Sequence, residues 1–259
     1  MLALLAPAKT LDFTPPPIEV EATRPCFEQD AAQIRRALLA LSAARLGRLM
    51  KLSPTRAKAT LAELKAFDPT APGGLPAALA FSGEVYRGLR ARELPTADLR
   101  WAQDRVGILS GLYGLLRPLD AVHPHRLEMA TRVATPRGHN LYAHWGGRVT
   151  EQVNALVEGH ADPTVVDLSS QEYVKVLWPR SLRGRLLSVV FENWKDAART
   201  PHPVPTLSRR ARGLMARFVV ERRIERAEEL RGFAEEGYAF QPDRSSAERY
   251  VFGRPFQER

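Results

Sequence analysis

The run Leu2-Ala-Leu-Leu-Ala6 is a continuous apolar stretch that Pro7 ends. A short apolar run bounded by a turn residue is typical of a strand that is buried on both faces of a sheet. We therefore predict a buried strand at 2–6 and a sheet at the centre of the fold. Similar runs, each predicted to be a strand, lie at 78–81, 106–109, 164–168 and 186–191.

Helical periodicity alternates with these apolar runs along the chain. Interspersed strands and helices indicate a mixed α/β class. We predict an α+β-like fold in one domain that spans residues 1–259, with a central mixed sheet flanked by helices. The predicted helices lie at 28–45, 54–67, 141–157 and 208–224, with shorter ones at 96–104 and 226–232.

The composition is that of a globular protein. Hydrophobic residues make up 44% of the 259 residues and charged residues 26%, which argues against a disordered or fibrous class. The single cysteine, Cys26, excludes an internal disulfide and a cysteine-based zinc site, and it fits a reducing compartment. No stretch approaches the roughly 20 apolar residues needed to span a bilayer. We expect a cytoplasmic monomer with no membrane partner.

The excess positive charge is confined to two segments. The first cluster, residues 45–65, holds six Lys or Arg against one acid, and the second cluster, residues 208–226, holds seven Arg against two acids. Together they carry a net charge of +10, against +9 for the whole chain. A local positive patch attracts polyanions, of which nucleic acid is the commonest. The segregation therefore favours DNA as the partner.

The first cluster fits two helices joined by a tight turn, at about 42–67. Ser53 is a natural N-cap, and Pro54 suits the first helical position. Basic residues at the start of a helix oppose its macrodipole, and a bound phosphate would remove that conflict. The alternative is an ordinary helical pair with a solvated basic face. The predicted DNA contacts are Arg48, Lys51, Ser53, Arg56 and Lys58.

The second cluster lies on a predicted helix whose apolar stripe at 211–219 indicates packing on a core. Gly213 and Ala216 lie among the arginines, where small residues let a backbone or a phosphate approach closely. The alternative is a solvated face with pairs to Glu221 and Glu225. We expect this face and the first cluster to border one groove. The predicted DNA contacts are Arg209, Arg210, Arg212 and Arg217.

Polar residues follow two predicted strands. A glycine-spaced turn starts at Ser110, and Ser169-Ser-Gln-Glu-Tyr173 follows the strand at 164–168. If both loops leave the same end of one sheet, they converge in one cleft. The predicted pocket residues are Arg117, Ser169, Ser170 and Tyr173, and the candidate catalytic residues are Lys9, Ser110, Glu172 and Lys175.

Lys9 has two interpretations, because it directly follows the first strand. It is a base or an imine-forming amine if burial lowers its pKa, and otherwise a member of a structural ion pair. The histidines, among them His139 and His144, lack the carboxylate-supported spacing of a metalloenzyme helix. We predict no metal site and no cofactor.

Six segments, taken in order, resemble the bacterial YaaA family of peroxide-stress proteins. The resemblance runs nearly from end to end of the chain. The segments are Leu5-Ala-Pro-Ala-Lys-Thr-Leu-Asp12, Phe81-Ser-Gly-Glu-Val-Tyr86, Leu109-Ser-Gly-Leu-Tyr-Gly-Leu-Leu-Arg-Pro-Leu-Asp120, Arg126-Leu-Glu-Met129, Leu168-Ser-Ser-Gln-Glu-Tyr173 and Arg212-Gly-Leu-Met-Ala-Arg-Phe218.

The resemblance implies a cytoplasmic protein of the hydrogen peroxide response that limits unincorporated iron. It also implies a mixed α/β fold with a helix-hairpin-helix element and a basic cleft that binds DNA. The first cluster resembles that element, although Lys51 and Ser53 stand where the motif usually has glycines. Further departures are Ser169 for Ala, Val174 for Phe and His125 for Tyr.

Three hypotheses follow for the function. The leading one is a DNA-binding protein of the oxidative-stress response, with phosphate contacts to double-stranded or structured DNA and little sequence preference. The second is an enzyme that acts on a nucleotide or nucleic acid through the Lys/Ser/Glu pocket. The third, direct sequestration of iron, is not favoured by one Cys and scattered His.

Overall fold

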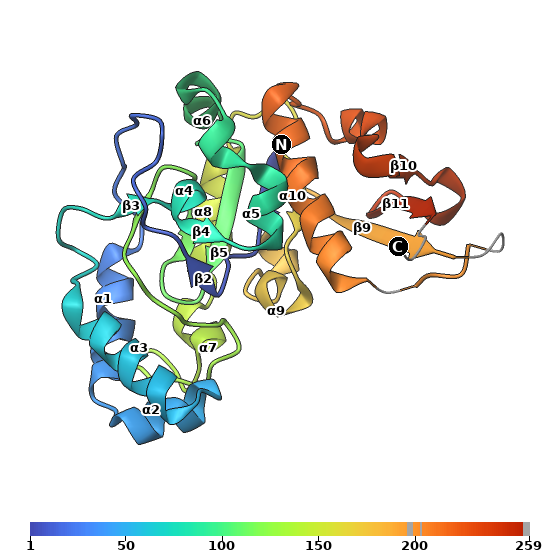
Figure 1. The fold of residues 1–259 in the computed structure, drawn as a ribbon. Coiled ribbons are helices and arrows are strands. Elements are labelled where there is room, and N and C mark those ends of the chain that lie inside the picture. The colour runs from blue at the N-terminus through green and yellow to red at the C-terminus, as the bar shows by residue number, and fades with distance from the viewer. Residues whose placement is uncertain (196–198, 203, 256–259) are drawn as a thin grey trace.

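The structure is a computed structural model, which describes residues 1–195, 199–202 and 204–255. A seven-stranded mixed sheet forms its centre (Figure 1). The buried strand β1 (Leu2–Leu5) pairs in parallel with β5 (Val106–Ser110) on one side and β8 (Val165–Leu168) on the other. The strand order is β10-β11-β9-β8-β1-β5-β6. The remaining strands of this sheet are β6 (Gly114–Leu116), β9 (Leu186–Trp194), β10 (Ala239–Phe240) and β11 (Arg249–Pro255).

Five neighbouring strands of the sheet are parallel, and β6 and β10 add an antiparallel edge on each side. This confirms the predicted central mixed sheet. Two short antiparallel strand pairs lie outside the seven-stranded sheet, and they are formed by the loops that leave this sheet. These pairs are β2 (Thr10–Leu11) with β4 (Phe81–Ser82), and β3 (Leu75–Pro76) with β7 (Ala121–Val122).

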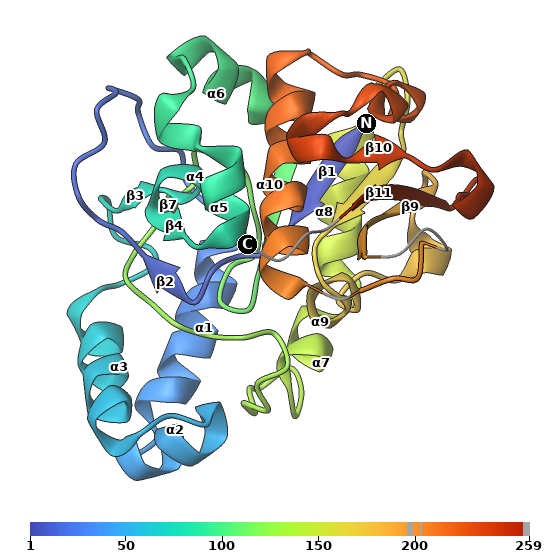
Figure 2. The ribbon, with the colours of Figure 1, turned by 45° about the vertical axis from the view of Figure 1, so that its right-hand side comes forward.

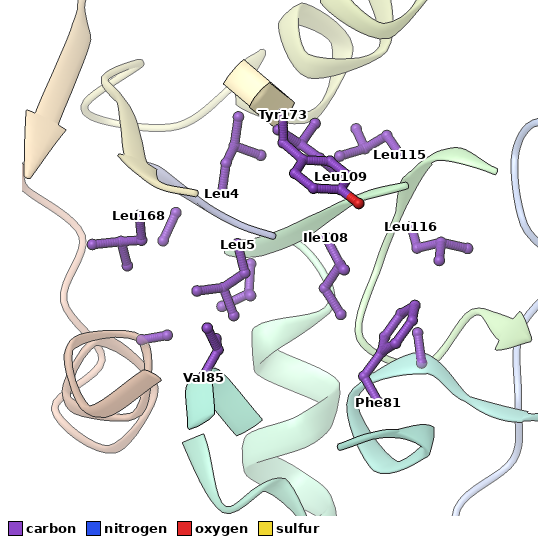
Figure 3. Packing of buried hydrophobic residues seen from close by; sticks show 14 of the residues in the cluster. Leu4, Leu5, Phe81, Val85, Ile108, Leu109, Leu115, Leu116, Leu168 and Tyr173 are labelled. Carbon is purple, nitrogen blue, oxygen red and sulfur yellow. The ribbon is translucent and has the colours of Figure 1, made fainter. Parts of the chain in front are cut away.

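Helices cover both faces of the sheet. α5 (Glu84–Leu89) and α10 (Pro205–Glu221) lie over one face, and α8 (Arg148–Val157) lies over the other (Figures 1 and 2). Figure 3 shows Leu5 and Ile108 on the side of Val85 from α5, while Leu4 and Leu109 lie on the opposite side. Successive side chains of a strand point to opposite faces, so strands covered on both sides are apolar throughout.

Three predicted elements differ from the structure. The apolar run 78–81 is not one strand: the short helix α4 (Ala77–Ala80) is followed by β4, because a run of four apolar residues fits either element when it is buried. The predicted helix at 28–45 is two helices, and the one at 141–157 breaks at Gly146, which has a φ of +49°. The remaining helices are α1 (Glu28–Leu39), α2 (Ala43–Met50), α3 (Pro54–Ala66), α6 (Thr96–Ala102), α7 (Leu141–Trp145) and α9 (Gln171–Val174).

The loops that carry most of the candidate pocket residues leave the same edge of the sheet. After β1 the chain crosses to β5 on one side, and the next parallel strand, β8, lies on the other side of β1. The carboxyl ends of β1 and β8 therefore form a topological switch point, where open α/β sheets bind ligands. Lys9 and Ser169 follow these two strands.

The helices α5 and α10 cross with their backbones in direct contact. A methyl group at Gly213 would overlap the carbonyl oxygen of Val85, and one at Gly88 would overlap the carbonyl oxygen of Arg210. Both glycines lie inside helices, where glycine is otherwise unfavourable. Their small size therefore sets how closely α10 lies against α5.

None of the helices in the described part of the chain combines the length and apolar character that crossing a bilayer requires.

Gly213→Ala is expected to lower the free energy of unfolding by about 3 kcal/mol, because the added methyl group must push two backbones apart. Urea denaturation followed by circular dichroism measures this change. Gly232→Ala is the matched control, since a Cβ there meets no atom within 4 Å, and it should alter stability by less than about 0.5 kcal/mol. Equal stability of the two variants would contradict the close helix crossing.

Candidate nucleic-acid interface

The first cluster folds into the α2–α3 unit, residues 43–66, which is two helices joined by a short turn. Each helix begins at a serine: the Ser42 hydroxyl accepts a hydrogen bond from the backbone N–H of Arg45, and the Ser53 hydroxyl accepts one from that of Arg56, both at 3.3 Å. Pro54 occupies the first turn of α3. These are the N-terminal signals that the sequence carries.

The turn between the two helices depends on Lys51, which has left-handed backbone angles, with φ 53° and ψ 49°. The carbonyl oxygen of Gly47 accepts hydrogen bonds from the N–H groups of both Lys51 and Leu52. Glycine normally takes this conformation because it has no Cβ. Lys51 therefore adopts the backbone conformation that a glycine usually takes in such a turn, and its charged side chain is exposed to solvent.

The side chain of Arg35, on α1, contacts the end of the α2–α3 unit and so links this unit to the rest of the protein. Its Nε donates to the carbonyl oxygen of Leu64 at 2.7 Å, and its guanidinium lies 5.6 Å from the centre of the Phe67 ring. Phe67 in turn stacks on His123, with ring centroids 5.1 Å apart. A cation at the last carbonyl groups of a helix also complements its dipole.

The cations of the α2–α3 unit are largely unpaired. Its one acid, Glu63, forms an ion pair with Arg56 at 3.2 Å, and the first turn of α3 has no acid. Five other cations are exposed and have no carboxylate partner among the described residues. They are Arg45, Arg48, Lys51, Lys58 and Lys65.

The arginines of the second cluster have a different environment. Arg210 pairs with Glu236 at 2.6 Å. The Arg217 side chain is only 12% exposed, pairs with Glu221 at 2.8 Å, and donates to the carbonyl oxygens at the end of α5. The predicted pairing with Glu221 therefore fits Arg217, whereas the partner of Arg210, Glu236, was not predicted, and the backbone that approaches Gly213 is that of α5.

Arg212 and Arg209 occupy different surroundings on the same helix. Burial lowers the pKa of the Arg212 guanidinium, and the nearby Asp167 carboxylate partly offsets that effect. Arg209 is exposed and has no carboxylate partner among the described residues. Figures 1 and 2 show α10 across the middle of the molecule and the α2–α3 unit at its lower left.

A small pocket at the carboxyl ends of β1 and β5 brings together part of the predicted cleft. Lys9, Ser110 and Tyr173 line it, as do Glu128 and His125. Its volume is about 10 Å³, which admits at most one water molecule. Lys9 forms an ion pair with Glu128 at 3.1 Å, and its side chain is 62% exposed.

His125 contributes a neutral imidazole to this pocket. Burial lowers its pKa to about 4, and its Nδ1 lies 2.8 Å from the carbonyl oxygen of His123. A carbonyl oxygen only accepts, so Nδ1 carries the hydrogen and Nε2 keeps its lone pair. Burial also favours the neutral form of Tyr173: it raises the pKa of the hydroxyl, which stays protonated.

The other predicted pocket residues make local structural contacts. The Glu172 carboxylate accepts from the backbone N–H of Ala130 at 3.0 Å, and the Ser169 hydroxyl donates to Asp167 at 2.6 Å. Arg117 pairs with the buried Asp120 at 3.0 Å. Ser170 is the N-cap residue of α9, and Lys175 lies exposed just after that helix.

Glu128, the partner of Lys9, was not predicted as a site residue. A signal was present, since Glu128 and Arg126 both belong to the segment Arg126-Leu-Glu-Met129 that carries part of the family resemblance. Arg126 also lines the pocket and lies 3.5 Å from Glu128. No group of three His, Cys, Asp or Glu side chains within the described ranges is arranged to hold a metal ion.

Comparison with known proteins places this fold and site in a family. Residues 1–244 match the family described as peroxide stress protein YaaA. A UPF0246 protein of Phenylobacterium zucineum is 46% identical over 255 residues, which cover 98% of this chain and 95% of the relative. UPF0246 proteins of Caulobacter vibrioides and Leptothrix cholodnii are 44% and 46% identical, each over 98% of this chain and 98% or more of their own length. The chain belongs to the YaaA family of peroxide stress proteins.

Proposed function

We propose that this protein binds DNA through phosphate contacts at the α2–α3 unit, which acts as a helix-hairpin-helix element. The observation that carries the proposal is the set of five exposed cations there without a carboxylate partner in the described structure. Unpaired cations that neutralise phosphates release the counterions condensed on the DNA, and this release supplies most of the affinity of non-specific binding. The absence of acids in the first turn of α3 also favours an anion at that helix start.

The proposed interface contains fewer residues than the DNA contacts predicted from the two basic clusters. Arg48, Lys51 and Lys58 contact phosphates, and the N-cap Ser53 orients the start of α3. Arg209 is the residue of α10 that adds to this binding, because Arg210 and Arg217 already have carboxylate partners. The cytoplasmic location and the limitation of iron-linked damage, both implied by the family resemblance, belong to the same proposal.

The double variant Lys51→Ala/Lys58→Ala is expected to weaken binding to all duplex sequences alike. The slope of log K against log salt should become less steep by about 0.9 for each phosphate that the variant no longer neutralises, and so by about 2. Fluorescence anisotropy with a labelled duplex at several salt concentrations measures both effects.

The matched control for this experiment is Arg100→Ala/Arg222→Ala. It removes the same charge from two exposed arginines outside the α2–α3 unit, one on α6 and one just after α10, and Figure 1 shows α6 at the end of the molecule opposite that unit. Its salt slope should equal that of the unaltered protein. If the two double variants behave alike, binding follows net charge, and the α2–α3 unit is not the interface.

Lys51→Gly separates stability from binding. Glycine adopts the left-handed angles of residue 51 without strain, so the free energy of unfolding should rise by about 0.5 to 1 kcal/mol. DNA affinity should fall, because the positive charge is removed. Lys58→Gly is the control: it removes the same charge from a helix interior, where glycine costs about 1 kcal/mol. Chemical denaturation and anisotropy together contradict the proposal if Lys51→Gly binds DNA as well as the unaltered protein does.

A second candidate function is an enzyme that acts on a nucleotide or nucleic acid. The specific observation is the pocket in which the Lys9–Glu128 pair meets Ser110 and a neutral His125. Its small volume requires Lys9 to swing outward before a substrate group can enter.

This candidate predicts a change in a labelled oligonucleotide or mononucleotide, detected by mass spectrometry after incubation with the protein. Lys9→Ala should abolish that change, while Lys65→Ala, which alters an exposed lysine far from the pocket, should leave it intact. An unchanged substrate with the unaltered protein removes the enzyme hypothesis and leaves the DNA-binding proposal in place.

A further inference from the structure

Trp178 is a large aromatic side chain that the fold leaves in water. It is 53% exposed, and among the described residues the other exposed large hydrophobic side chain is Phe13, at 37%. Burial of an indole ring would stabilise the fold, and an exposed ring does not contribute this stabilisation. The other three tryptophans are more covered, with Trp145 fully buried.

The backbone around Trp178 is held firmly against α8. The N–H of Trp178 donates to the Thr150 hydroxyl at 2.9 Å. Four residues further along the same helix, the Asn154 side chain bonds both the carbonyl oxygen of Ser181 at 2.8 Å and the N–H of Arg183 at 2.9 Å. Positions four apart lie on one side of a helix, so α8 fixes residues 178–183 at three points. The ring is therefore presented from an ordered segment, which reduces the entropic cost of binding.

The ring itself lies against the backbone at two glycines, with the Glu151 side chain close by, since its Oε1 would lie 3.7 Å from a Cβ at Gly147. A Cβ at Gly147 would lie 3.3 Å from the nearest ring atom of Trp178, and one at Gly146 would lie 3.9 Å from it. The glycines at the junction of α7 and α8 thus leave space for the indole beside the backbone. Protein backbone supports part of the ring, and more than half of the residue stays open to a ligand.

Two exposed cations lie close to Trp178 in sequence. The backbone of Val176 bonds to that of Tyr173, and the backbone of Leu177 bonds to that of Val174, so the helical turn of α9 continues past its end. Lys175 lies in this turn, and Trp178 leaves it with extended backbone angles, φ −99° and ψ 97°. Lys175 and Arg180 are exposed and have no carboxylate partner in the described parts of the chain. An aromatic face beside positive charge suits a nucleobase and its phosphates.

Other occupants fit this surface less well. A membrane-binding surface buries several neighbouring apolar side chains, and a protein interface has an apolar centre. The residues next to Trp178 in sequence are Leu177, which is buried, and the exposed run Pro179-Arg-Ser181. One ring among charges offers a stacking surface and little apolar area.

We propose that Trp178 is a stacking site for an unpaired nucleobase, and that Lys175 and Arg180 contact the phosphates of the same strand. This inference rests on the proposed DNA binding and narrows its substrate class to DNA that contains unpaired bases. α9 and the α2–α3 unit lie toward the same, lower end of the molecule in both views (Figures 1 and 2). A duplex segment at the unit and an adjoining single strand at Trp178 would use both surfaces.

The test compares a fluorescein-labelled oligothymidylate with a duplex of equal length by anisotropy. Trp178→Ala should weaken binding of the single strand about tenfold, since stacking contributes about 1 to 3 kcal/mol per base. Its duplex affinity should stay within about twofold, because a paired base does not stack on the ring. Trp178→Phe should keep most of the single-strand affinity. Phe13→Ala, which removes the other exposed aromatic ring, is the matched control and should change neither affinity.

Tryptophan fluorescence supplies a second measurement on the same variants. Stacking of thymine should quench the emission of Trp178, and the quenching should disappear in Trp178→Phe. Unchanged single-strand affinity of Trp178→Ala, or an equal decrease for both DNA forms, would overturn the stacking site. A blue shift with phosphatidylglycerol vesicles and none of the expected quenching would overturn it in favour of a membrane surface.

The two proposals can fail separately in this experiment. Salt-dependent binding of the duplex without binding of the oligothymidylate keeps the α2–α3 proposal and removes the stacking site. Binding of neither DNA form by the unaltered protein removes both proposals.

Discussion

The direct backbone contact between α5 and α10 constrains much of the remaining structure. No side chain separates the two helices at Gly88 and Gly213, so α10 lies in one fixed position over the sheet. In this position Arg217 reaches the carbonyl oxygens of Leu89 and Arg90, at the negative end of the α5 dipole. The same helix carries Arg212, which is half-buried and lies near Asp167. The helix contact therefore decides which arginines of α10 remain available to a ligand.

The two basic clusters show why equal charge does not mean equal function. In the α2–α3 unit the acid Glu63 is already paired with Arg56, and the other cations face solvent. On α10, Glu236 from a distant segment neutralises Arg210, and Glu221 of the same helix pairs with Arg217. An exposed ion pair contributes little stability, but it does remove a cation from the set that attracts a polyanion. The proposed interface is accordingly centred on Lys51 and Lys58.

The loop that follows β1 lines a pocket beside the switch point, and the surrounding chain has nearly filled it. Lys9 and Ser110 follow β1 and β5, as expected for ligand-binding loops of an α/β sheet. The segment that carries His125 and Glu128 closes over them and leaves about 10 Å³. Lys9 remains largely exposed beside Glu128, so the interpretation of a structural ion pair fits it better than that of a buried amine. DNA binding at the surface requires no such opening.

Local patterns in the sequence determined the secondary structure wherever a short run of residues fits one kind of element only. The apolar runs at β1, β5, β8 and β9 predicted buried strands, and Ser53-Pro54 predicted the start of α3, because burial and capping act over a few residues. The run at 78–81 was wrongly predicted as one strand, and β11, which lies between β9 and the edge strand β10, was not predicted. Only the tertiary structure decided which cations are paired, that Glu128 meets Lys9, and that Trp178 stays in water. These outcomes depend on contacts between segments far apart in the chain, which no local periodicity encodes.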